Sequence, residues 1–188
     1  IDRLRRAAHL PPGKTLATLD QARLPRPLVE KLRTLARGDF LDGAQNVLCF
    51  GLPGTGKSHA ASAIGHALVE AGHAVLFVPT YQIVQELLVA KRELDLPRAL
   101  RKLDLFELII CDDLGYVAQS SDEAEVLFTL MAERYERRSM LITSNPNRAT
   151  VEQSLSRFSR SFAPLALQTV SRLSRSRRSR ASRAPDGL

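Results

Sequence analysis

The chain has 188 residues, of which 44% are hydrophobic and 25% are charged, and its formal net charge is +7. This length is sufficient for one domain with a sizeable core, or for a domain followed by an unstructured tail. No charged-then-apolar leader opens the sequence, and no apolar run reaches the roughly 18 residues that a membrane-spanning helix needs. We therefore expect a cytoplasmic protein without a membrane partner.

The positive charge is concentrated near the C-terminus. Residues 151–188 hold eight of the 27 basic residues but only two of the 20 acidic residues, so this segment carries +6 of the net charge of +7. The first 150 residues are therefore close to neutral, and the overall basicity says little about the chemistry of the domain that precedes the tail.

Residues 1–45 are predicted to form an N-terminal arm and a helix. The first 25 residues show no sustained period, which favours a short helix followed by an extended arm. The second helix is predicted to begin near Pro27 and to end near Gly38, because proline is tolerated in a first turn and glycine commonly ends a helix. Its apolar residues recur at helical spacing: Leu28, Leu32 and Leu35.

Residues 46–58 read Asn-Val-Leu-Cys-Phe-Gly-Leu-Pro-Gly-Thr-Gly-Lys-Ser and predict a phosphate-binding loop between a buried strand and a helix. Glycines 51, 54 and 56 are expected to adopt positive φ and to turn backbone N–H groups toward a polyphosphate. A glycine-rich turn that spells this motif by chance is the alternative, which the flanking strand and helix disfavour. ATP or GTP is the implied ligand.

Each residue of this loop receives a predicted role in binding. Lys57 adds a positive charge for phosphate binding and catalysis, and the Ser58 hydroxyl is placed to ligate Mg²⁺ at the start of the helix. The predicted nucleotide-binding residues are Gly51, Leu52, Pro53, Gly54, Thr55, Gly56, Lys57, Ser58 and His59.

Strands and helices alternate through the predicted core, residues 46–145. After the helix that follows the loop, strands are predicted over residues 74–78, 106–113 and 140–145, and helices over 81–94, 97–103 and 121–138. This alternation predicts an α/β fold in which helices cover both faces of a parallel sheet. Ligands of such sheets bind beyond the carboxyl ends of the strands.

Two acidic residues end the strand predicted over 106–113, and Asn145 ends the last strand. Asp112 is predicted to bind Mg²⁺ together with Ser58, because hard cations prefer oxygen ligands. Asp113, which strand alternation points to the other side, is predicted to orient and deprotonate the attacking water. Asn145 is predicted to hold the water or the γ-phosphate. The alternative is that all three are ordinary turn formers at strand ends.

Four other residues receive structural interpretations. Cys49 and Cys111 lie in apolar strand-like runs, and a strand predicted between them excludes a disulfide. His59 and His66 lie on one helix face, but a metal pair is disfavoured because no cysteine or carboxylate accompanies them at ligand spacing.

The helix predicted over residues 121–138 ends in three arginines. They are predicted to complement the negative end of the helix dipole. The alternative is that they reach the nucleotide of a neighbouring subunit. The residues are Arg134, Arg137 and Arg138.

Residues 51–58, 108–116, 127–138 and 141–145 together resemble the IstB-like transposition helper ATPases, an AAA+ family related to DnaC-like helicase loaders. The resemblance covers roughly residues 10–145. It implies a sheet of strand order 5-1-4-3-2, ATP and Mg²⁺ as cofactors, and a homo-oligomer that assembles on duplex DNA in the presence of ATP. It also implies delivery of target DNA to a transposase encoded nearby. A replicative helicase loader is the near alternative.

In that family the Walker A pair corresponds to Lys57 and Ser58, and the Walker B pair to Asp112 and Asp113, with Asn145 as the sensor. Many AAA+ enzymes carry glutamate where Asp113 stands, so the resemblance also implies that hydrolysis is slow.

The similarity to the family is expected to stop at Pro146. Residues 146–188 become rich in serine and arginine, a composition that cannot bury a core, so we predict a disordered tail and leave the fifth strand in doubt. A frame shift or truncation explains this change, and a genuine nucleic-acid-binding arm is the alternative. A third possibility is a nucleotide-binding remnant without activity.

Overall fold

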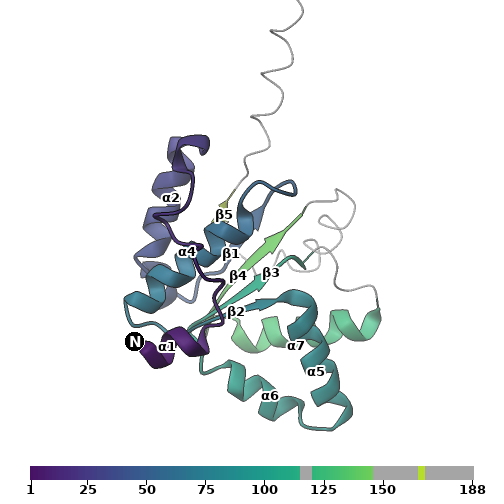
Figure 1. The fold of residues 1–188 in the computed structure, drawn as a ribbon. Helices are drawn as coiled ribbons and strands as arrows, with labels where there is room; N and C mark the ends of the chain where they lie inside the picture. The colour runs from purple at the N-terminus through teal and green to yellow at the C-terminus, as the bar shows by residue number, and fades with distance from the viewer. Residues whose placement is uncertain (115–119, 146–164, 168–188) are drawn as a thin grey trace, which may run out of the picture.

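The computed structural model describes residues 1–114, 120–145 and 165–167. Within these residues the centre of the molecule is a parallel sheet with the strand order β2-β3-β4-β1-β5 (Figure 1). This is the predicted order 5-1-4-3-2. The strands are β1 (Val47–Phe50), β2 (Val75–Pro79), β3 (Leu108–Asp112), β4 (Ser139–Ser144) and β5 (Leu165–Leu167).

Helices connect the strands and cover the sheet. They are α1 (Asp2–Ala7), the 3-10 helix η1 (Gln21–Arg23), α2 (Arg26–Ala36), α3 (Asp39–Asp42), α4 (Lys57–Glu70), α5 (Thr80–Arg92), α6 (Leu96–Leu103) and α7 (Ser121–Arg134). None of the helices in the described part of the chain has the length and apolarity needed to cross a bilayer.

The strands are continuous apolar runs because both faces of the sheet are buried. Leu48, Ile109 and Ile142 belong to the core beneath α5, α6 and α7. The alternate positions, such as Ile110 and Leu141, belong to a second core beneath α2 and α4 (Figure 1). The helices therefore form two layers around the sheet, as the alternation of strands and helices predicted.

The fifth strand, which the sequence left in doubt, is present at the edge of the sheet. Leu165 pairs with Val47 and Leu167 pairs with Cys49 in a parallel register. The predicted disorder of the tail, and its explanation by a frame shift or by a nucleic-acid arm, concern residues 146–164 and 168–188, which lie outside the described residues.

The two cysteines are buried free thiols, as predicted. Strand β4 lies between β1 and β3, so Cys49 and Cys111 occupy strands that do not neighbour each other. Burial raises the pKa of Cys49 to about 11 and that of Cys111 to about 12. Both side chains therefore act as small apolar residues of the core.

Helix α7 begins with a capping box and ends earlier than predicted. The Ser120 side chain accepts a hydrogen bond from the Glu123 N–H, and the Glu123 carboxylate accepts one from the Ser120 N–H. The helix ends at Arg134 rather than Arg138, because the backbone of the next residue, Tyr135, is extended (φ −55°, ψ 129°).

Arg134 does more than complement the helix dipole. Its side chain is only 2% exposed, and its guanidinium donates hydrogen bonds to the backbone carbonyls of Leu103 (3.0 Å), Phe106 (2.9 Å) and Ser139 (3.0 Å). Burial lowers its pKa to about 10. Arg134 thus joins the end of α6 to the segments that enter β3 and β4, and it is not accessible to a neighbouring subunit.

Candidate nucleotide-binding site

The phosphate loop lies between β1 and α4, as predicted. Gly54 (φ +76°) and Gly56 (φ +87°) have left-handed backbones, which a residue with a Cβ rarely adopts. Gly51 does not, contrary to the prediction, because its N–H still donates to the Ser144 carbonyl of β4 (3.3 Å) and so extends the sheet by one residue. The turn of the loop is therefore made by its last two glycines.

Lys57 is the first residue of α4, and its side chain lies across the loop. Its Nζ donates a hydrogen bond to the Leu52 carbonyl at 2.9 Å. Burial lowers the pKa of Lys57, whereas the carboxylates of Asp113 and Asp112 act in the opposite direction. Both predicted acidic residues therefore lie near enough to Lys57 to raise its pKa against the effect of burial.

Thr143 connects the ends of β3 and β4. Its hydroxyl donates a hydrogen bond to Oδ1 of Asp112 (2.6 Å) and accepts one from the N–H of Asp113 (2.9 Å). The Thr143 side chain is 1% exposed, so these two bonds replace any contact with water. One buried hydroxyl thus holds both acidic residues in place.

Asp113 does not follow the alternation that the sequence predicted. Its φ is +59°, so the extended backbone ends at Asp112 and the next side chain is redirected. As a result Asp113 lines the same cavity as Lys57 and Ser58 instead of pointing to the opposite side of the sheet.

Asn145 lies beside Asp113 because β4 runs between β1 and β3. Its Nδ2 donates a weak hydrogen bond to Oδ1 of Asp113 (3.3 Å). Its own Oδ1 is buried and has no hydrogen-bond partner among the residues that the structure describes. A buried amide oxygen without a partner is a free acceptor for a ligand or water.

These residues surround a cavity of about 380 Å³. Most of the predicted nucleotide-binding residues line it, together with two that sequence reasoning missed as site residues, Lys14 and Thr143. Leu52 is half exposed at the outside of the loop. The lining residues are Lys14, Pro53, Gly54, Gly56, Lys57, Ser58, His59, Asp113, Thr143 and Asn145.

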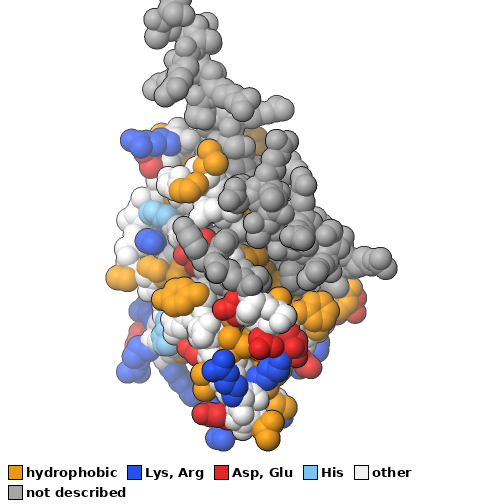
Figure 2. Space-filling view, turned by 90° about the vertical axis from the view of Figure 1, so that its right-hand side faces the viewer, with side chains coloured by type: hydrophobic (Ala, Val, Ile, Leu, Met, Phe, Trp, Pro, Cys, Tyr) orange, Lys and Arg blue, Asp and Glu red, His pale blue; other side chains and the backbone are white. Residues whose placement is uncertain are grey.

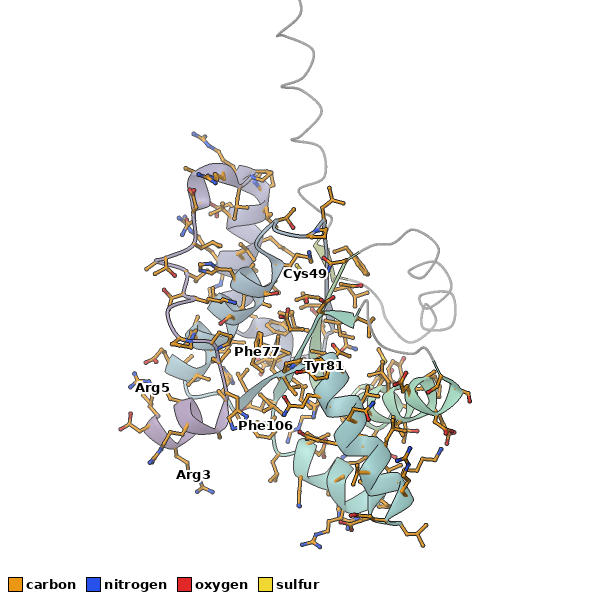
Figure 3. The ribbon with its side chains drawn as sticks, turned by 45° about the vertical axis from the view of Figure 1, so that its right-hand side comes forward. Arg3, Arg5, Cys49, Phe77, Tyr81 and Phe106 are labelled. Atoms are coloured by element: carbon orange, nitrogen blue, oxygen red, sulfur yellow. The ribbon has the colours of Figure 1, made fainter. Side chains whose placement is uncertain are left out.

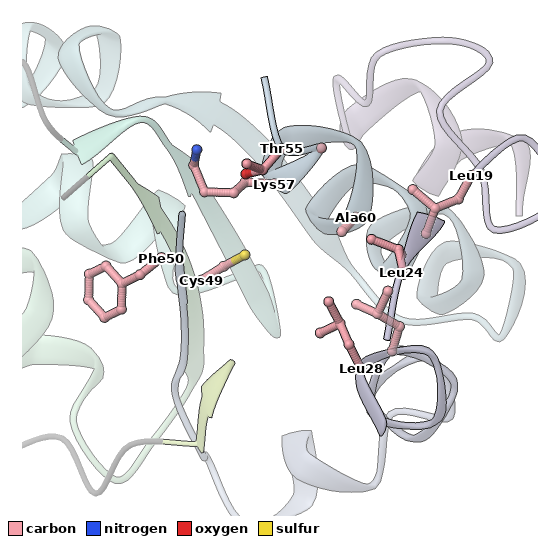
Figure 4. Close-up of a pocket in the computed structure, with 10 residues that line it drawn as sticks. Leu19, Leu24, Leu28, Cys49, Phe50, Thr55, Lys57 and Ala60 are labelled. Carbon is pink, nitrogen blue, oxygen red and sulfur yellow. The ribbon is translucent and has the colours of Figure 1, made fainter. Parts of the chain in front are cut away.

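A second, smaller hollow of about 40 Å³ lies behind the loop. Figure 4 shows Leu19, Leu24 and Leu28 on one side of it and Cys49 of β1 on the other. Thr55, a predicted nucleotide-binding residue, lines this hollow instead of the main cavity. The hollow is too small for a nucleoside, so we assign the nucleotide to the main cavity.

The donor set fits Mg²⁺ bound with a nucleotide. Within the described residues no group of three or more His, Cys, Asp or Glu side chains could hold a metal by itself. Mg²⁺ needs few protein ligands, because phosphate oxygens and water complete its coordination. Ser58, which lines the cavity, and Asp112, whose Oδ1 is held by Thr143, are the two predicted ligands.

The two histidines of α4 are packed rather than paired around a metal, as expected. The Nε2 of His66 lies 3.0 Å from the Pro11 carbonyl, and the Nε2 of His59 lies 3.1 Å from the Thr15 carbonyl. His59 also lines the cavity, so its predicted contact with the nucleotide remains a prediction.

A family model described as IstB-like ATP binding protein matches residues 1–162. The chain belongs to this IstB-like family. The resemblance seen in the motifs is therefore confirmed, and the match continues beyond Pro146, where the sequence was expected to leave the family. The ATP-binding description of this family agrees with the phosphate loop, which lines the main cavity.

Relatives of this IstB-like chain carry names from insertion sequences. It is 50% identical over 146 residues to an insertion-sequence ATP-binding protein of Sinorhizobium fredii, covering 77% of this chain and 49% of the relative. It is 40% identical over 141 residues to the insertion sequence IS21 ATP-binding protein of Pseudomonas aeruginosa, covering 73% of this chain and 52% of the relative. The chain thus spans about half the length of these curated relatives.

Solved structures show that the IstB-like chain has the P-loop AAA+ fold. The DnaC helicase loader matches with a TM-score of 0.65 at 21% identity, covering 88% of this chain and 99% of that chain. AMPPCP-bound DnaA from Aquifex aeolicus matches with a TM-score of 0.70 at 16% identity, covering 84% of this chain and 51% of that chain. At these identities the likeness concerns the fold alone.

Proposed function

We propose that this chain binds ATP with Mg²⁺ in the main cavity and hydrolyses it. The observation that carries the proposal is that Lys57 and Ser58, at the N-terminus of α4, line the same cavity as Asp113 and Asn145. The unpaired amides of a helix N-terminus and a lysine bind phosphate, while carboxylates at strand ends bind the metal ion and accept a proton from the attacking water.

Each residue then has a defined task in hydrolysis. Lys57 leaves the Leu52 carbonyl and binds phosphate oxygens. Asp113 accepts the proton of the attacking water, and Asn145 orients that water or the γ-phosphate through its free amide oxygen or its N–H group. Mg²⁺, when bound by Ser58 and Asp112, neutralises phosphate charge.

We further propose that the chain is an ATP-dependent helper of insertion-sequence transposition. The names of its relatives support this role over that of a helicase loader, since the likeness to DnaC concerns only the fold. In this role it forms a homo-oligomer on duplex DNA and delivers that DNA to a transposase. Acidic and basic side chains are interspersed over the described residues in Figure 2, so we assign no DNA-binding patch to that face.

The domain organisation that we propose follows the sequence. Residues 1–45 form an N-terminal arm and helix, and residues 46–145 form the ATP-binding core. Residues 146–188 form an atypical tail, from which β5 adds a strand to the sheet.

Two measurements test the proposed function. Titration of the purified chain with ATP and Mg²⁺ in a calorimeter should show saturable binding, which Lys57→Ala should abolish. ATP hydrolysis should increase when duplex DNA is added, with a parallel increase in particle size. Absence of heat from well-folded protein would contradict nucleotide binding. Binding without stimulation or assembly would instead indicate an inactive nucleotide-binding remnant.

A further inference from the structure

Residues 8–18, here called the N-terminal strap, run from the end of α1 along α4 toward the start of that helix (Figure 1). At its start the Ala8 carbonyl accepts a hydrogen bond of 2.7 Å from the N–H of Phe77, the β2 residue labelled in Figure 3. A Cβ on Gly65 would lie 2.6 Å from Leu10 and 2.9 Å from Ile110 of β3. The strap therefore packs closely on the side of α4 that faces β3.

Two histidines of α4 fasten the strap along its length. His66 Nε2 lies 3.0 Å from the Pro11 carbonyl. Near the start of α4, His59 Nε2 lies 3.1 Å from the Thr15 carbonyl and 3.2 Å from the Thr18 hydroxyl. These contacts hold the strap at Pro11, Thr15 and Thr18.

The last part of the strap is also held by bonds within itself. The Thr18 hydroxyl donates to the Gly13 carbonyl (2.6 Å), and it accepts a hydrogen bond from the Thr15 N–H (2.9 Å). Gly13 has a φ of +75°, which permits the turn that starts this part. The backbone on both sides of Lys14 is therefore held in a hydrogen-bonded turn.

Lys14 is a positively charged residue of the cavity whose side chain stabilises no other part of the described structure. It lines the cavity with Lys57, Ser58 and Asp113, and it makes no hydrogen bond or ion pair with any residue that the structure describes. Lys14 therefore shares one cavity with Asp113 and Asn145, the residues to which the proposed function assigns the water and the γ-phosphate.

We propose that Lys14 is a second cationic binding residue, which contacts the terminal phosphate of the bound nucleoside triphosphate. The proposal rests on the proposed function of the cavity and adds a residue that the phosphate-loop motif does not contain. A lysine next to a multiply charged phosphate gains a charge-assisted hydrogen bond. The two histidines would act as positioning residues that hold the strap in place for this contact.

The test compares ATP with ADP, since only ATP has the third phosphate. In the 188-residue chain with Mg²⁺, Lys14→Ala should weaken ATP binding about fivefold to tenfold, the effect of one partly exposed charge-assisted hydrogen bond, and ADP binding less than about twofold. Lys14→Arg should restore most of the affinity for ATP. Lys102→Ala, which removes the same charge from the exposed surface of α6, should change neither affinity.

The outcomes separate this inference from the proposed function. If the unaltered chain binds no ATP, both fail. If it binds ATP and Lys14→Ala binds ATP equally well, only the role of Lys14 is overturned. Equal losses for ATP and ADP would also overturn it, because they would indicate a general disturbance of the site. The midpoint of thermal unfolding should not change in Lys14→Ala or in a second variant, Lys14→Gln, since the side chain has no partner in the described residues.

Discussion

The Thr143 hydroxyl donates a 2.6 Å hydrogen bond to Oδ1 of Asp112, and it accepts the backbone N–H of Asp113 at 2.9 Å. These bonds link the end of β4 to the end of β3. They also keep Asp113 in a backbone conformation (φ +59°) that a residue with a side chain rarely adopts. The geometry of the predicted metal ligand Asp112 and of the predicted catalytic residue Asp113 therefore depends on a residue that contacts neither metal nor phosphate in our proposal.

We predict that Thr143→Val lowers ATP turnover about tenfold to a hundredfold, the usual effect of losing a residue that orients metal ligands. Valine has the same shape but leaves Asp112 without its donor and the Asp113 N–H without an acceptor. Steady-state kinetics over a range of Mg²⁺ concentrations would show a raised Mg²⁺ requirement. Thr143→Ser, which keeps the hydroxyl, should retain activity, and equal losses in both variants would contradict the role of the hydroxyl.

We predict that Asp113→Asn leaves ATP binding intact and lowers turnover at least about a hundredfold, because an amide cannot accept the proton of the attacking water. The amide oxygen can still accept the Asn145 hydrogen bond, so the local structure should persist. Single-turnover hydrolysis and ATP titration on the same preparation check both parts. Asp39→Asn, at an exposed position of α3, serves as the control. Turnover close to that of the unaltered chain would remove Asp113 from the mechanism.

We predict that Arg134→Met lowers the free energy of unfolding by about 3 kcal/mol or more, because several buried carbonyls lose their donor together. Arg134→Lys should recover only part of this loss, since an ammonium group does not reproduce the planar fork of a guanidinium. Urea unfolding measures both variants. Arg138→Ala, a change at an exposed position of the same region, should have little effect. A Met variant within about 1 kcal/mol of the unaltered chain would contradict the structural role.

Glu107 provides a prediction on pH. Burial raises the pKa of Glu107, but hydrogen bonds from His73 and from the Ala74 N–H lower it by more, so its folded-state pKa lies below the usual 4.5. A depressed carboxyl pKa stabilises the fold above the unfolded-state value, and this contribution is lost as the pH falls through the folded-state value.

Glu107→Gln should therefore reduce the free energy of unfolding near pH 7 by about 0.5–1 kcal/mol, a value discounted for the partial exposure of the carboxylate. The difference from the unaltered chain should shrink as the pH falls below 4.5. Denaturant unfolding at a series of pH values measures it. Glu86→Gln, at an exposed position of α5, is the control, and a difference that grows in acid would refute the assignment.

Local spacing was sufficient to predict the phosphate loop and the buried strands. The loop motif fixes Gly56, Lys57 and Ser58 at adjacent positions, so its chemistry can be read without knowledge of the fold. Strands buried on both faces produce apolar runs that stand out in the sequence. The strand order came from the family resemblance, because the spacing of residues along the chain contains no information on which strands are neighbours.

The remaining features depend on contacts between distant parts of the chain. Alternation along a strand assumes an extended backbone, and it failed at Asp113 because Thr143 stabilises a left-handed residue there. The rule for helix ends assigned Arg134 to the dipole, but burial against three other segments decides its role. Lys14 was missed because only the folded strap brings residue 14 to the loop that starts at residue 51.

The hydrogen bond between Ala8 and Phe77 has a consequence for solubility. In the described part of the chain β2 pairs only with β3, so β2 is an edge strand whose outer side has no neighbouring strand to pair with its backbone groups. Exposed edge strands pair with strands of other molecules, and this pairing can begin aggregation. The Ala8 carbonyl accepts a hydrogen bond from the N–H of Phe77, in the middle of β2. The Arg5–Glu70 ion pair holds the adjoining helix α1 against α4. The N-terminal residues thus shield the sheet from unwanted partner chains.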